Sequence, residues 1–67
     1  MVVKVIEVLA QSDKSWEDAA QIALREASKS VRNIKSIYVS EMQGKVENAR
    51  IVEYRLNAKI SFAVEGT

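Results

Sequence analysis

The sequence contains few side chains of the kinds that enzymes use for nucleophilic or metal chemistry. It has no histidine and no cysteine, and it shows no nucleophile elbow, glycine-rich phosphate loop or aspartate-rich calcium loop. Without thiolates or imidazoles, a disulfide and a structural zinc site of the usual kind are both excluded. These observations predict a protein that is not an enzyme.

Acidic side chains gather where a helix is predicted to begin. Asp13, Glu17 and Asp18 could converge on calcium or magnesium, because these ions prefer oxygen ligands. Complementarity with the positive end of the helix dipole explains the same residues without an ion, and we favour it. Trp16 could stack on a ligand, but its position at the head of an apolar helix stripe makes core packing the better interpretation.

A second charged group follows one predicted strand. Arg50, Arg55 and Lys59 project from one strand face and could bind phosphate groups, but Glu53 lies among them. Ion pairing across strands therefore explains this group better than an anion site does.

The elements that must position these residues are dominated by one long strand from Arg50 to Val64. Its apolar side is made of Val52, Tyr54, Leu56, Ala58, Ile60, Phe62 and Val64. At about 3.3 Å per residue the strand would be roughly 50 Å long, whereas typical strands reach about 17 to 20 Å. A chain this small can hardly cover such an apolar face, so the pattern predicts association with other copies.

The rest of the chain supplies three further elements. Val2–Leu9 is rich in β-branched residues and suits a first strand, and Ser15 suits the cap of a helix of about 16 residues that starts at Trp16. Ile34–Gln43 returns to strict alternation, and Gly44–Ala49 is the expected hairpin turn. The predicted fold class is α+β, with the order β-α-β-β and an antiparallel sheet.

Length and charge place the whole chain, residues 1–67, in a single domain. The net charge of +1 gives no reason to expect nucleic acid or a membrane as a partner. The apolar segment Met1–Leu9 is too short for a signal peptide or a membrane span, and it carries the charged residues Lys4 and Glu7. We therefore expect a cytoplasmic protein.

Four stretches of the sequence together resemble the dodecin family: Val2–Val8, Asp13–Ala20, Ala27–Ile34 and Glu53–Phe62. The resemblance covers nearly the whole chain. It implies a β-α-β-β protein whose long, three-stranded antiparallel sheet wraps its helix, with twelve copies closing into a hollow shell. Many dodecins bind riboflavin, lumichrome or the flavin mononucleotide in stacked pairs and store the flavin rather than convert it.

The residues that the resemblance assigns to flavin binding are changed in this sequence. The stacking tryptophan is replaced by Ser36, and the glutamine at the polar edge of the ring is replaced by Arg55, which can donate but not accept hydrogen bonds. The basic residues of the phosphate side are replaced by Gln43 and Ala63. The resemblance therefore implies a ligand site at Ser36, Gln43 and Arg55 whose ligand differs from that of most dodecins.

Three functional hypotheses follow from this resemblance. The leading one is a dodecin-like shell, a homo-oligomer of twelve copies, that binds or stores another small molecule or ion. Calcium is a candidate because some relatives without the tryptophan are associated with it, although no residue here can be assigned as a metal ligand. The second retains flavin, with Tyr38 or Tyr54 in place of the indole. The third is a structural oligomer without a specific ligand.

Overall fold

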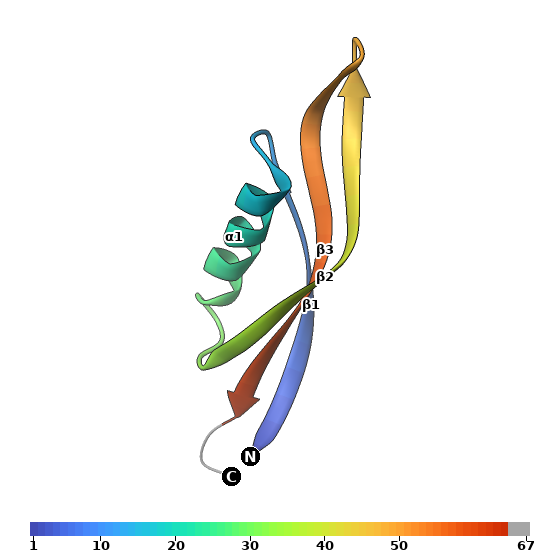
Figure 1. The fold of residues 1–67 in the computed structure, drawn as a ribbon. Coiled ribbons are helices and arrows are strands. Elements are labelled where there is room, and N and C mark those ends of the chain that lie inside the picture. Colours follow the sequence, from blue (N-terminus) through green and yellow to red (C-terminus); the bar gives the residue numbers. More distant parts are fainter. Residues whose placement is uncertain (65–67) are drawn as a thin grey trace.

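The computed structural model describes residues 1–64 and has the predicted order of elements, as Figure 1 shows. In chain order the elements are β1 (Val2–Ser12), α1 (Trp16–Ala27), β2 (Ile34–Glu47) and β3 (Arg50–Val64). The three strands form one sheet in the order β1-β3-β2, and both pairings are antiparallel. The predicted β-α-β-β fold, with a three-stranded antiparallel sheet and one helix, is confirmed.

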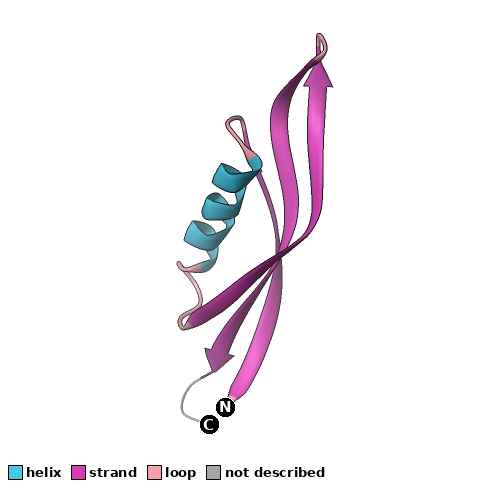
Figure 2. Cartoon of the chain, viewed as in Figure 1, coloured by secondary structure: helices cyan, strands magenta, loops and turns pink. Residues whose placement is uncertain are grey.

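The long strand lies at the centre of the sheet and has the predicted bounds. β3 runs for 15 residues between the two outer strands, and the molecule extends 52 Å along its longest axis. The helix lies against the middle of the sheet, and the hairpin of β2 and β3 projects beyond it (Figure 2). One helix thus leaves much of the sheet uncovered.

The helix packs closely on the sheet because its inner side is made of alanine. Ala19 packs with Leu56 and Ala58, while Ala23 packs with Ile60, and all five are buried. Side chains this small bring the helix backbone close to the strands, as the narrow apolar stripe predicted.

The helix begins as predicted but ends earlier. The Ser15 hydroxyl accepts a hydrogen bond from the backbone N–H of Asp18 over 2.9 Å, so Ser15 caps the helix at Trp16. A helix of about 16 residues was expected, but α1 has 12 and ends at Ala27. The hydroxyl of Ser28 donates to the carbonyl of Arg25, and this competing hydrogen bond accompanies the end of the helix.

The hairpin turn is shorter than predicted. Both strands continue to a two-residue turn at Asn48 and Ala49, whose φ angles of 53° and 62° are those of a type I′ turn. Gly44 was expected in the turn but lies inside β2, opposite Tyr54. A Cβ atom at Gly44 would lie 3.2 Å from Cγ2 of Ile51, which is a tight contact, and 3.5 Å from the Trp16 ring, which is an ordinary one.

Two bulges in β2 change which residues share a face. Register shifts leave Lys35 and Ser40 without a partner on β3, and an extra residue reverses the side that the following residues take. Strict alternation predicted Met42 on the face of Ser36. Instead, Met42 lies on the helix side, opposite Leu56.

We call the side of the sheet away from α1 the open face. Its residues on β1 are Val3, Val5, Glu7, Leu9 and Gln11, those on β3 are Glu53, Arg55, Asn57, Lys59 and Ser61, and those on β2 are Ser36, Tyr38, Glu41, Gln43 and Lys45. Within residues 1–64, no helix is both long enough and apolar enough to cross a membrane.

Candidate ligand-binding site

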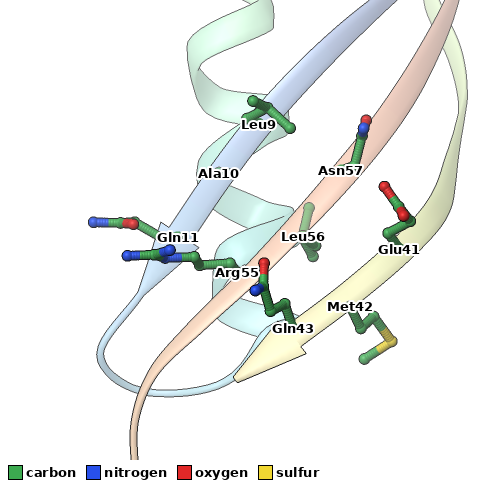
Figure 3. A pocket seen from close by; sticks show the side chains of 9 residues that line it. All are labelled: Leu9, Ala10, Gln11, Glu41, Met42, Gln43, Arg55, Leu56 and Asn57. Carbon is green, nitrogen blue, oxygen red and sulfur yellow. The ribbon is translucent and has the colours of Figure 1, made fainter. Parts of the chain in front are cut away.

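The open face carries a pocket of about 690 Å³ (Figure 3). Each strand supplies three consecutive residues to its lining, which are Leu9, Ala10 and Gln11, Glu41, Met42 and Gln43, and Arg55, Leu56 and Asn57. The volume falls in the range of about 300 to 1,000 Å³ that is typical of small-molecule sites.

The register of the sheet arranges the polar lining in two rows. Arg55 lies between Gln11 of β1 and Gln43 of β2, and we call these three the Arg55 row. Two residues further along β3, Asn57 lies between Leu9 and Glu41, and these three form the Asn57 row. Side chains in directly opposite positions of neighbouring strands are about 4.5 to 5.5 Å apart at Cβ, so a small ligand can contact a whole row.

Arg55 both lines the pocket and forms an ion pair. Its Nη2 atom lies 2.9 Å from Oε1 of Glu53, and its side chain is 46% exposed. The prediction of pairing across strands is wrong for Arg55, because Glu53 lies two residues away on the same strand. Within residues 1–64 no ion pair involves Arg50 or Lys59, the other cations of this group.

The Asn57 row contains two acceptors without partners in the described part of the chain. The Oδ1 atom of Asn57 is buried and accepts no hydrogen bond, which costs about 1–3 kcal/mol of folding free energy. Glu41, opposite Asn57, is exposed and takes part in none of the hydrogen bonds or ion pairs of residues 1–64. The described residues thus leave both acceptors without a donor.

Trp16 supports the pocket from the helix side. Its Nε1 donates to the backbone carbonyl oxygens of Gln43 and Arg55, each over 3.2 Å. Its ring meets that of Tyr54 edge-on, with centroids 4.8 Å apart. Trp16 packs against the buried cluster of Ala19, Leu56 and Ala58, as predicted, and its contact with the two site carbonyls was not predicted.

The fold has counterparts among known proteins, and the family model of the dodecins matches residues 2–65. This chain belongs to the dodecin family. The match spans every helix and strand of the described structure, so the family resemblance seen in the sequence is confirmed.

Curated relatives and solved structures agree with this assignment. The calcium dodecin of Mycobacterium tuberculosis is 38% identical over 61 residues, which cover 91% of this chain and 86% of that protein. The dodecin of Thermus thermophilus is 32% identical and covers 98% of this chain and 96% of that protein. A crystal structure of a Thermus thermophilus protein, also 32% identical, matches with a TM-score of 0.91 over 98% of this chain and 97% of that one.

Of the three residues that the dodecin resemblance predicts to bind a ligand, only two lie together. Gln43 and Arg55 lie opposite each other in the pocket. Ser36 lies on the same face, but its partner Ser61 is six residues beyond Arg55, which is about 20 Å along the strand. The Ser36 hydroxyl is hydrogen-bonded to that of Ser61. Within one copy, a small molecule cannot contact both Ser36 and Arg55.

The two tyrosines considered as substitutes for the dodecin indole lie on different sides. Tyr38 is 65% exposed on the open face, whereas Tyr54 lies on the helix side against Trp16. Among the described residues that line the pocket, none is aromatic. Only Tyr38 is therefore placed to stack on a ligand of the open face.

Seven of the nine residues that line the pocket were not predicted as site residues, and four of these seven lie on the open face. Leu9 and Gln11 join the site through the pairing of β1 with β3, which a short-range pattern does not reveal, and the bulge at Ser40 brings Glu41 onto the face of Asn57. Asn57 had one usable signal, its place on the polar side of the alternating strand. The other three lining residues, Ala10, Met42 and Leu56, lie on the helix side of the sheet.

The carboxylates at the helix start do not form a metal centre. The Asp18 carboxylate accepts a hydrogen bond of 2.6 Å from the Ser12 hydroxyl, which agrees with a structural role at the cap. Within residues 1–64, no three histidine, cysteine or acidic side chains gather in a way that could hold a metal. The cation interpretation of Asp13, Glu17 and Asp18 therefore finds no support.

Proposed function

We propose that this dodecin is a cytoplasmic binding and storage protein that works as a hollow shell of twelve copies and has no catalytic activity. The pocket on the open face is its ligand site. The observation that carries this proposal is the convergence of Gln43 and Arg55, both assigned to the ligand by the family resemblance, in one pocket with the unpartnered acceptors Glu41 and Asn57.

Assembly is supported by the apolar side chains left uncovered on the open face. Val3, Val5 and Leu9 are 53%, 58% and 79% exposed. Apolar surface of this kind marks sites of protein association. Light scattering tests the shell directly, because a chain of 7.5 kDa should give particles of about 90 kDa if twelve copies assemble. A monomer would contradict the proposal.

The ligand proposed for this site is not a stacked flavin. Ser36 offers a hydroxyl in place of an indole, and aromatic stacking contributes about 0.5–1.5 kcal/mol beyond area burial. Titration of riboflavin should therefore leave the flavin fluorescence unquenched at micromolar protein. The flavin alternative requires quenching that disappears in Tyr38→Ala, because Tyr38 is the tyrosine of the open face.

Calcium is the alternative suggested by the relatives. A solved Mycobacterium tuberculosis structure, 34% identical with a TM-score of 0.82, is described as a calcium-chelating antigen with a novel calcium-binding site, and the match covers 100% of this chain and 96% of that one. Glu41 and Asn57 offer oxygens of the type that calcium takes, but the Arg55 row places a cation beside them. Calorimetric titration with calcium, with magnesium as the control, tests this ion.

The structural-oligomer hypothesis makes the opposite prediction. If the assembled protein binds neither flavin, nor calcium, nor any small polar molecule, the pocket has no ligand and the shell alone is the function. Binding studies on the assembled protein thus separate storage from a purely structural role.

A further inference from the structure

The two rows of the pocket have opposite hydrogen-bonding character. Arg55 can only donate, and the glutamines on both sides of it carry donor amides. In the next row, ionised Glu41 can only accept, and Asn57 holds an acceptor oxygen without a partner. One end of the pocket is therefore rich in donors, while the other end holds a carboxylate and an acceptor oxygen that has no partner in the described residues.

The charges of the described residues follow the same division. Arg55 donates to Glu53 through Nη2, and the Gln11 amide donates to the same carboxylate over 3.5 Å. A guanidinium has five N–H donors, so others remain free for a ligand. Glu41 has no cation paired with it in residues 1–64. A carboxylate ligand therefore suits the Arg55 row, and an ammonium group suits the Asn57 row.

The separation of the two rows and the volume of the pocket indicate a ligand with two charged groups. Arg55 and Asn57 are two residues apart on β3, so the rows are separated by about 7 Å. A bare ion would occupy one row only, and the pocket of about 690 Å³ has room for an organic molecule that reaches both. Leu9, 79% exposed in the Asn57 row, offers an apolar surface to the chain between the two groups.

We propose that the pocket binds a small zwitterion whose carboxylate contacts Arg55 and whose ammonium group lies between Glu41 and Asn57. This inference rests on the proposed binding function and names the chemical class of the ligand. An unbranched amino acid with its amine at the far end of the chain has the required shape. A simple carboxylate, a simple amine or a metal ion satisfies one row and leaves the other unpaired.

Three probes of equal carbon number test the ligand class. We expect δ-aminovalerate to bind the assembled protein about tenfold more tightly than valerate or pentylamine, because it alone makes both charge-assisted contacts. Calorimetry gives the affinities, and ligand-observed NMR confirms contact. Affinity for δ-aminovalerate no greater than for the two single-charge probes, or no binding of any probe, would overturn the proposal.

Matched variants identify the residues involved. Glu41→Gln should weaken binding of δ-aminovalerate about tenfold and leave that of valerate unchanged, and Arg55→Gln should weaken both. Glu47→Gln and Arg50→Gln remove the same charges from the same strands outside the pocket and should change neither affinity. Equal losses in Glu41→Gln and Glu47→Gln would contradict the proposed site. Light scattering on the same samples reports assembly separately, so failure of the ligand class is distinguishable from failure of the shell.

Discussion

Trp16 reaches from the helix to the backbone of Gln43, and its indole Nε1 lies 3.2 Å from the Gln43 carbonyl oxygen. This hydrogen bond joins the start of α1 to the strand that forms one side of the pocket. The packing of the helix and the position of a pocket residue are thus set by the same side chain.

Trp16→Phe should destabilise the protein by about 1–2 kcal/mol, because the ring is largely kept while its N–H donor is lost. Urea denaturation at one protein concentration measures the change, since stability depends on concentration in an oligomer. Tyr54→Phe is the control, because no hydrogen bond involves the Tyr54 hydroxyl in residues 1–64. Equal stability of both variants would show that the indole hydrogen bond is unimportant.

Substitution of Gly44 should show how closely the indole packs on β2. In Gly44→Ala the new Cβ lies 3.2 Å from Cγ2 of Ile51, whose exposed side chain can move, so we expect a change below about 1 kcal/mol. Gly44→Val adds methyl groups beside Trp16 and should cost about 1–3 kcal/mol. Thermal unfolding and the wavelength of tryptophan emission measure both effects. A valine variant as stable as the alanine one, with unchanged emission, would refute the close packing.

Ser36→Trp should introduce flavin binding. The substitution restores an aromatic platform, which supplies about 150–250 Å² of contact surface, at the position where the family resemblance places one. Riboflavin fluorescence should be quenched by this variant and not by the original protein. Lys35→Trp, which puts the indole at the bulged neighbouring position, serves as the control. Failure of Ser36→Trp to quench more than Lys35→Trp would mean that Ser36 does not face a flavin-sized site.

Val5→Asp should prevent assembly without unfolding the chain. Val5 is 58% exposed and contributes to neither of the two core clusters of the described residues, and a charge is costly to bury in an apolar interface. Light scattering should show a smaller particle, while circular dichroism retains the α+β spectrum. Gln21→Asp, on the exposed side of the helix, should leave the particle intact. An assembled Val5→Asp variant would remove this part of the open face from the interface.

The sequence predicts the structural features that depend on a local residue pattern better than those that have no such pattern. The bounds of the long strand and the Ser15 cap follow from local patterns and are confirmed. The bulge at Ser40 inserts one residue without a distinctive local signal, and it reverses the predicted side of Met42. The prediction that Gly44 lies in the hairpin turn is wrong, because the turn is formed by Asn48 and Ala49, which adopt positive φ angles without a glycine.

The residues of the candidate site were also predictable only in part. Gln43 and Arg55 were identified by their counterparts in a known family, and their meeting in one pocket confirms only that they are neighbours. Gln11 and Leu9 depended on the register of two strands far apart in the sequence, for which single-strand periodicity carries no information.

The sheet order β1-β3-β2 has a consequence for how the chain folds. β2 and β3 adjoin in sequence, so their hairpin can form locally, whereas β1 pairs with β3 across most of the chain, from Val2 with Val64 to Ser12 with Tyr54. Long-range pairings of this kind form slowly because a large loop must close first. During synthesis, β1 therefore cannot pair until β3 has been made, and the apolar valines of β1 are exposed to other chains during that interval.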